Sequence, residues 1–129
     1  MKFSIIDTKK SDLEEILILN QLALPAVSSV TIDEMANFLD IADYFKSIII
    51  DNIVAGFLIA LHPGKDYHSL NYKWFEKRYN SFIYVDRIVI SYSFRGNGLP
   101  TAFYNDLAMS PLPLSKPLMA RSERADRIG

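Results

Sequence analysis

The sequence has 129 residues, which is enough for one domain with a buried core. Lys and Arg total 14 and Asp and Glu total 15, so no global positive field would attract nucleic acid or an anionic membrane, and neither is expected as a partner. Cysteine is absent, which excludes disulfides, thiolate nucleophiles and thiolate metal ligands.

The N-terminal stretch MKFSIIDTKKSDLEE lacks the continuous apolar core of a signal peptide. No run of the sequence approaches the roughly 18 apolar residues of a membrane span. The two histidines, His62 and His68, have no further ligands at a recognisable metal-site spacing. We therefore expect a cytoplasmic protein without a metal site.

A short strand is expected at residues 3–6, followed by two helices. Ser11-Asp12-Leu13-Glu14 matches a capping box and predicts a helix to about Leu22. Thr31-Ile32-Asp33-Glu34 repeats this signature and predicts a second helix. Each helix has one face spaced for burial, formed by Leu13, Ile16, Leu17 and Asn20 in the first and by Met35, Phe38, Leu39 and Ala42 in the second.

Two strands are predicted next, at residues 45–50 and 53–61. Only Asp51-Asn52 separates them, which indicates a tight hairpin. The second strand is apolar on both faces, so we expect it in the centre of a sheet. Gly56 inside it indicates a bulge or a close approach of another backbone.

Residues 62–80 form a long irregular stretch that is rich in aromatic side chains, with a short helix predicted at 73–78. Two interpretations of these side chains remain open. They pack over the edge of the sheet, or they form a wall of a substrate pocket, because such pockets are commonly aromatic. The aromatic and imidazole side chains concerned are Tyr67, His68, Tyr72, Trp74, Phe75 and Tyr79.

Residues 82–90 have β-branched or aromatic side chains at nearly every position, which favours a strand buried on both faces. Asp86 and Arg87 interrupt it. The glycine loop 95–100 follows, and then a helical pattern that runs to Leu107. Glycines at a helix start let the backbone approach a ligand, and the free N–H groups there attract an anion. The stretch predicts a phosphate or pyrophosphate site, although two glycines before a helix also suit an ordinary turn.

This strand and loop resemble motif A of the GNAT superfamily, the acetyl-CoA-dependent N-acetyltransferases. In that motif an apolar strand is followed, after five residues, by Arg/Gln-x-x-Gly-x-Gly/Ala. Pro100 departs from the pattern at the final Gly/Ala position, where it lacks the N–H that the family offers a phosphate oxygen. The resemblance implies acetyl-CoA as cosubstrate, bound by Ile88, Val89 and Ile90 at the strand end and by Arg95, Gly96, Asn97, Gly98 and Leu99 on the loop.

The resemblance covers residues 1–108, a partial GNAT-like acetyltransferase domain, and implies an α/β (α+β) fold. Its central sheet would be mixed, mostly antiparallel and flanked by helices. Residues 109–129 hold three prolines, at positions 111, 113 and 117, and are predicted to be a Pro-rich irregular tail. A GNAT chain would continue with another strand, a helix and closing strands, so these usual C-terminal elements are expected to be missing.

The reaction implied by the resemblance is direct transfer of acetyl from acetyl-CoA to a small-molecule or peptide amine of unknown identity. Asp86 is the candidate base or acceptor-binding carboxylate, because strand alternation would place it on one face with Tyr84, Ile88 and Ile90. The other interpretation of Asp86 is a structural charge paired with a neighbouring basic residue.

Without a following strand, the edge of residues 82–90 would be exposed and one wall of the cofactor slot would be absent. The tail folding back, a second chain pairing as a homodimer, or a truncated or frameshifted product of impaired activity would each account for this. The alternative function is a non-catalytic CoA-binding or protein-interaction domain of the same fold. A third interpretation is an α/β interaction module whose glycine loop is merely a turn.

Overall fold

The computed structural model describes residues 2–110 and 118–121, the last four as backbone. A five-stranded sheet in the order β1-β2-β3-β4-β5 forms its centre. β1 to β4 pair antiparallel and β5 lies parallel to β4, so the predicted mixed and mostly antiparallel α/β (α+β) sheet is confirmed. The strands are β1 (Ser4–Asp7), β2 (Tyr44–Ile50), β3 (Ile53–Leu61), β4 (Phe82–Ile90) and β5 (Leu118–Arg121).

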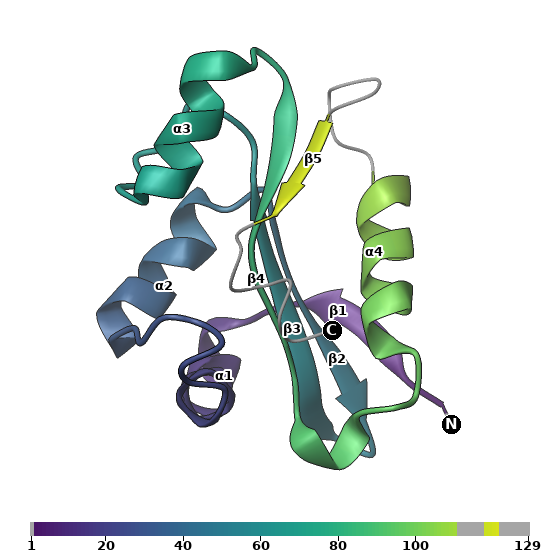
Figure 1. The fold of residues 1–129 in the computed structure, drawn as a ribbon. Coiled ribbons are helices and arrows are strands. Elements are labelled where there is room, and N and C mark those ends of the chain that lie inside the picture. The colour runs from purple at the N-terminus through teal and green to yellow at the C-terminus, as the bar shows by residue number, and fades with distance from the viewer. Residues whose placement is uncertain (1, 111–117, 122–129) are drawn as a thin grey trace.

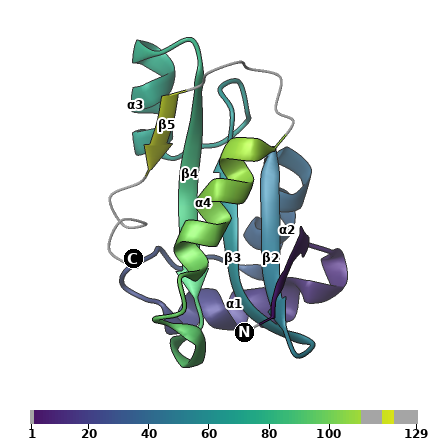
Figure 2. The same ribbon diagram turned by 90° about the vertical axis from the view of Figure 1, so that its right-hand side faces the viewer.

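Helices cover both faces of the sheet (Figures 1 and 2). One face carries α1 (Leu13–Leu22), α2 (Ile32–Ile41) and α3 (Leu70–Arg78), and the other carries α4 (Leu99–Met109). The buried side chains accordingly form two apolar clusters, one under the first three helices and one under α4. Within the described ranges no helix is long and apolar enough to cross a membrane.

Several local features follow from side chains that the sequence analysis identified. The capping box of α2 is confirmed: Thr31 N donates to Glu34 Oε1 at 2.9 Å, and Glu34 N donates to Thr31 Oγ1 at 3.1 Å. Asp51 and Asn52 both have positive φ, as a two-residue hairpin turn requires.

Two helix starts differ from the prediction. Before α1, residues 10–12 form a 3-10 turn, and Asp12 is the N-cap residue in place of Ser11. The Asp12 carboxylate accepts from Lys9 N at 2.9 Å, and α1 has no side-chain cap, so the prediction of a capping box at Ser11 is wrong. α3 begins at Leu70, three residues earlier than expected, because the Ser69 hydroxyl caps it by accepting from Tyr72 N at 3.2 Å.

Gly56 lies in β3 opposite Ile90 of β4, where there is no room for a side chain. A Cβ atom at this position would lie 2.6 Å from the Val89 carbonyl oxygen and 2.8 Å from Ile90 Cδ1. The β2–β3 register also shifts beside it, between Ile48 and Ile49. Both outcomes expected of a glycine inside this strand, a bulge and a close backbone approach, are therefore found.

We expect Gly56→Ala to destabilise the protein by about 1–3 kcal/mol, as overpacking of a tight interior does. The backbone of β4 must move to admit the methyl group, since the nearest atom is a carbonyl oxygen. Urea denaturation of wild type and variant measures the difference. An unchanged midpoint would contradict the close packing of β3 against β4 at this position.

The irregular tail predicted for residues 109–129 is wrong at two places. Met109 is the last residue of α4. Residues 118–121 are a strand, β5, and not part of an irregular tail. β5 pairs with Phe82–Val85, so the expectation that the whole edge of β4 is exposed and that the next strand is missing is wrong for this half of β4. Four residues are enough for parallel pairing, even after a run of prolines. Residues 111–117 and 122–129, also predicted to be irregular, lie outside the described residues.

Candidate active site

β4 has one half that is paired on both sides and one half that is not. β5 pairs only with Phe82–Val85, and among the residues that the structure describes no strand lies beside residues 86–90 on that edge. Ser91 N donates to Ala55 O at 2.7 Å, so the backbone groups of Ser91 point toward β3. In an antiparallel pair, every second residue bonds the partner strand and the residues between point away from it. This alternation directs the backbone N–H and C=O of Ile88 and Ile90 toward the open edge. In agreement, Arg95 Nε donates to Ile90 O at 3.4 Å.

The loop that follows β4 leads directly into α4. Gly96 and Gly98 have φ of +82° and +71°, and a Cβ atom at either position would find no heavy atom within 4 Å. Asn97 Nδ2 donates to Phe94 O at 3.0 Å and so braces the loop from within. Buried Leu99 anchors the helix start to the core under α4. The backbone at both glycines is thus exposed and approachable.

The N-terminus of α4 has no side-chain cap. Gly98 is the N-cap residue, and the first helical bond runs from Ala102 N to Gly98 O at 3.2 Å. The N–H groups of Leu99 and Thr101 therefore lie outside the intrahelical bonds, while Pro100 in the first turn has no N–H to offer. The open strand, the glycine loop and the helix start that the sequence singled out are contiguous in space.

Asp86 occupies a β-bulge. Ile59 pairs with Arg87 and Ala60 pairs with Val85, which leaves Asp86 as the extra residue of β4. The bulge breaks the alternation, so Asp86 lies on the same side as Tyr84, whereas Ile88 and Ile90 lie in the cluster under α4. The prediction that these four side chains share one face is wrong for Ile88 and Ile90 for this reason.

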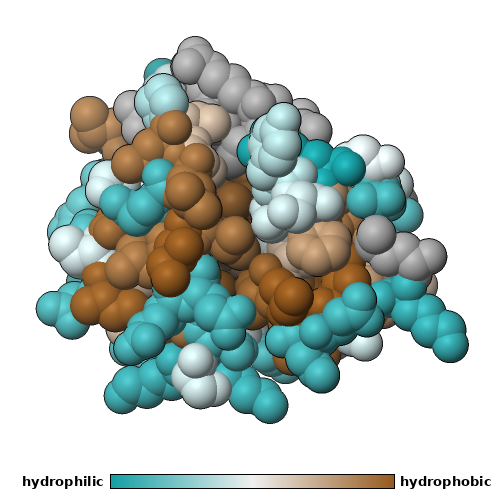
Figure 3. All heavy atoms as spheres, turned by 90° about the horizontal axis from the view of Figure 1, so that it is seen from below, coloured by the Kyte–Doolittle hydropathy of each residue, from teal (hydrophilic) through white to brown (hydrophobic). Residues whose placement is uncertain are grey.

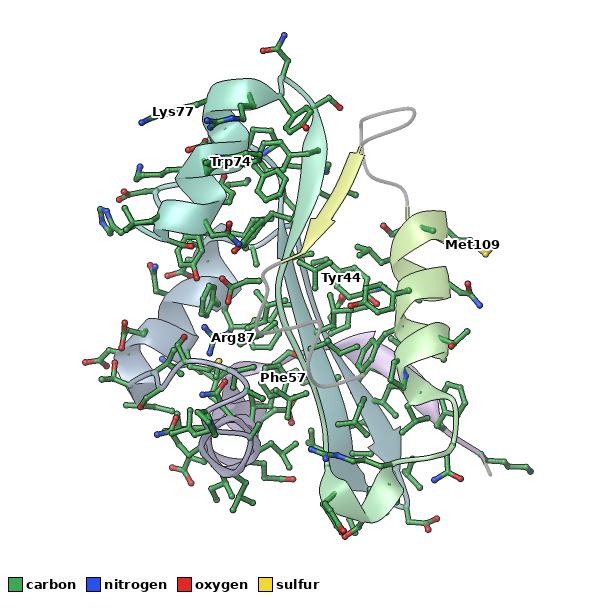
Figure 4. All side chains as sticks on the ribbon, viewed as in Figure 1. Tyr44, Phe57, Trp74, Lys77, Arg87 and Met109 are labelled. Carbon is green, nitrogen blue, oxygen red and sulfur yellow. The ribbon has the colours of Figure 1, made fainter. Side chains whose placement is uncertain are left out.

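Asp86 and Arg87 form a buried ion pair, with side chains only 5% and 4% exposed. Arg87 Nε donates to Asp86 Oδ2 at 2.7 Å. The other guanidinium nitrogens reach across to the end of α1 and the segment after it: Nη1 donates to Asn20 Oδ1 at 2.8 Å and to Ser28 O at 3.0 Å, and Nη2 donates to Ser28 Oγ at 2.9 Å. Figure 4 shows Arg87 on the α1–α2 side of the sheet, opposite α4.

Tyr67 closes the other side of this ion pair. Its hydroxyl donates to Asp86 Oδ1, and its ring meets the edges of Phe38 and Tyr72 with centroids 5.4 Å apart in each case. Burial, and then the Asp86 carboxylate, raise the pKa of Tyr67 well above its ordinary value. The phenol therefore stays neutral and acts as a hydrogen-bond donor.

The structure supports the packing interpretation for some of the aromatic side chains of residues 62–80. Tyr72 is fully buried, and Phe75 packs against the cluster under the first three helices. Trp74 and Tyr79 are 44% and 41% exposed. Tyr67 packs on this cluster and also contacts Asp86, so it is the aromatic residue that connects the stretch to the candidate site.

Neither histidine lies in a metal-like cluster. His62 is buried, and its Nδ1 lies 3.1 Å from the Phe82 carbonyl oxygen. His68 is exposed beside Asp66. In the described part of the chain no group of three or more His, Asp or Glu side chains is placed to hold a metal ion.

The residues that sequence reasoning missed are the partners of Arg87. Two signals pointed toward them. A positive charge inside an otherwise apolar strand needs buried acceptors, and Asn20 is a polar residue in the predicted buried stripe of α1. Neither signal identifies Ser28, which lies in the segment between α1 and α2.

The end of the molecule that carries α1 and the loop after β4 shows apolar side chains among hydrophilic ones (Figure 3). Ile18 and Leu22 of α1 are 60% and 78% exposed. They lie outside the buried stripe predicted for this helix. Three members of that stripe, Leu13, Ile16 and Asn20, are buried.

No sequence model of a known protein family matches the chain, and no curated protein matches it. Its fold, however, is similar to those of solved acetyltransferases. The aminoglycoside 6'-N-acetyltransferase AAC(6')-Ih from Acinetobacter baumannii has a TM-score of 0.70 at 15% identity, over 94% of this chain and 79% of that one. The loading GNATL domain of CurA from Lyngbya majuscula has a TM-score of 0.69 at 11% identity, over 89% and 61%.

A third similar structure is Ard1 from Thermoplasma volcanium, with a TM-score of 0.64 at 13% identity over 81% of this chain. The chain spans 60% of the length of Ard1 and 61% of the CurA domain, less than two thirds in both cases. These likenesses show that the protein has the fold of the GNAT superfamily.

Proposed function

We propose that this GNAT-fold chain binds acetyl-CoA and transfers its acetyl group to a small-molecule or peptide amine. One observation supports this most directly: the open half of β4 is followed, after a 3-10 turn at Tyr92–Phe94, by two exposed glycines and an uncapped helix start. Backbone N–H groups at such a helix start bind phosphate groups well. An open strand edge is suited to hold an extended arm that carries amide groups.

In this proposal Arg95, Gly96, Asn97, Gly98 and Leu99 hold the pyrophosphate, and Ile88, Val89 and Ile90 hold the pantetheine arm. The thioester carbonyl would then lie beside the bulge, where a backbone N–H polarises it. The amine nitrogen attacks the carbonyl carbon, the C–N bond forms, and the C–S bond breaks. No covalent enzyme intermediate is needed, so the absence of cysteine is no obstacle.

Asp86 is the proposed base. It is the first residue of β4 beyond the part that pairs with β5. The proton that the ammonium form of the acceptor must lose would pass to its carboxylate. The nitrogen sheds a second proton after the attack, which balances the proton that the leaving thiolate takes up. Arg87 and Tyr67 hold this carboxylate in one orientation.

The second candidate function is a non-catalytic CoA-binding or protein-interaction domain. A specific observation favours it: both Asp86 oxygens already accept hydrogen bonds, from Tyr67 and from Arg87. A carboxylate used in this way can serve structure alone. Under this alternative the loop 95–100 still binds CoA, but no amine is acetylated.

The deciding experiment combines binding and turnover on the wild-type protein. Titration calorimetry with acetyl-CoA and with CoA tests the loop, and release of free thiol tests turnover with a diamino acid, an aminoglycoside and a peptide with a free N-terminus. Binding with turnover supports acetyl transfer. Binding without turnover favours the non-catalytic alternative, and no binding overturns both.

The same samples test the homodimer, which is one of the three ways that the sequence left open to account for the edge of β4. Because β5 covers Phe82–Val85, pairing of two chains through β4 is limited to residues 86–90 and would compete with the proposed cofactor arm. Acetyl-CoA would then shift the mass in solution toward the monomer. The cytoplasmic location stays a prediction.

Pro100→Ala is expected to strengthen binding of acetyl-CoA. Alanine restores a backbone N–H in the first turn of α4 without the flexibility of glycine. One added hydrogen bond to a charged phosphate is expected to strengthen binding about tenfold. Calorimetry on both proteins measures the change, and unaltered or weaker binding would contradict a phosphate at this turn.

A further inference from the structure

A single guanidinium group joins the candidate site to the segment between α1 and α2, residues 23–31. Arg87 donates from Nε to Asp86 and from Nη1 and Nη2 to Asn20 and Ser28. Its donors therefore serve two different tasks. Nε binds the Asp86 carboxylate in the bulge. Nη1 and Nη2 bind Asn20 of α1 and Ser28 of the 23–31 segment.

Further contacts make this arrangement a closed ring. The Arg87 guanidinium lies 5.5 Å from the centroid of the Phe38 ring, and that ring meets Tyr67, whose hydroxyl donates to Asp86. These contacts form a closed cycle of four side chains, Asp86–Arg87–Phe38–Tyr67. The cycle connects β4, α2 and the segment 62–69 before α3. Arg87 bonds directly to Ser28 of the 23–31 segment and reaches Tyr67 of the 62–69 segment through Asp86 and Phe38.

These four side chains meet just beyond the part of β4 that is covered by β5, since Val85 is the last residue of β4 that pairs with β5. This inference rests on the proposed function, under which thioester and amine meet at that point. We propose that Arg87 is a positioning residue, which orients the Asp86 carboxylate and holds the 23–31 segment against β4. Lysine cannot replace it, because one ammonium group cannot match the fork of a guanidinium.

The test compares Arg87→Lys with wild type on the full chain. Hydrogen exchange of residues 23–31 and 62–69 is expected to rise about tenfold, and the KM for the amine that wild type turns over best to rise by a similar factor of about ten, as loss of charged hydrogen bonds implies. Acetyl-CoA affinity, measured by calorimetry, should change less than about twofold. Arg87 lies on the face of the sheet under α1 and α2, whereas the start of α4 packs on the opposite face through Leu99.

Two further variants keep the result decisive. Ser28→Ala removes only the bond from Nη2 and retains the ion pair, so it should raise exchange of residues 23–31 in the same direction even where Arg87→Lys fails to fold. Lys46→Met breaks an ion pair with Asp106 on the α4 side and should leave that exchange unchanged.

Unchanged exchange of residues 23–31 in Arg87→Lys and Ser28→Ala overturns the positioning role, whatever the activity. A drop in acetyl-CoA affinity as large as the rise in amine KM overturns it too, because it indicates general loss of structure. Failure of the proposed function has a different signature: wild type acetylates none of the amines, while the exchange data still report whether Arg87 orders the segment.

Discussion

Gly98→Glu is expected to weaken binding of acetyl-CoA on the order of 100-fold, which corresponds to roughly 2.7 kcal/mol. Gly98 is the N-cap residue of α4 with φ of +71°, a conformation that side chains with a Cβ atom rarely adopt. The new carboxylate would compete for the helix N–H groups and repel the pyrophosphate. Titration calorimetry on wild type and variant measures the loss.

Gly64→Glu is the matched control. Gly64 also has a positive φ, of +91°, and a Cβ atom there meets nothing within 4 Å. The control thus places the same side chain in the same kind of backbone, after β3 and away from the loop. It should bind acetyl-CoA as wild type does. Equal loss in both variants would mean that backbone strain, and not the loop as an anion site, determines the result.

The parts of the fold that could be predicted depend on contacts between near neighbours in sequence. The capping box at Thr31 and the hairpin turn at Asp51-Asn52 are decided by three or four residues, and both are confirmed. The strand–loop–helix order predicted for residues 82–107 is likewise a local pattern. It was found from its glycines and its run of apolar residues.

The bulge at Asp86 could not be predicted, because it is a property of two strands. Nothing in residues 82–90 alone shows that Ile59 opposes Arg87 while Ala60 opposes Val85. Periodicity assigns side chains to faces only while the alternation is unbroken. Because of a single extra residue, Ile88 and Ile90 lie on the face opposite Asp86. The candidate site therefore does not have these side chains on one face.

β5 was missed for a related reason. A four-residue strand has little periodicity, and the prolines before it argue against a regular sheet. The strand is defined by its pairing with Phe82–Val85, which lie more than 30 residues earlier in the chain. The sequence therefore predicted an open edge along the whole of β4, and the structure confines it to residues 86–90 within the described part of the chain.

Arg87→Met is expected to lower the free energy of unfolding by about 3–5 kcal/mol, the range for removing one partner of a buried ion pair. The substitution keeps the apolar stem but removes the guanidinium from a carboxylate whose side chain is 5% exposed. It also removes three hydrogen bonds to Asn20 and Ser28. Urea denaturation followed by circular dichroism measures the loss.

Two comparisons distinguish the cost of an unpaired buried charge from the cost of lost side-chain packing. Asp86→Asn combined with Arg87→Met removes both charges and leaves an oxygen for the Tyr67 hydroxyl, so the double variant should be more stable than Arg87→Met alone. Lys46→Met breaks a pair whose side chains are 26% and 35% exposed, and it should lose less than about 1 kcal/mol. If Arg87→Met is no less stable than Lys46→Met, the Arg87 guanidinium does not hold the 23–31 segment to the sheet, and its positioning role is contradicted.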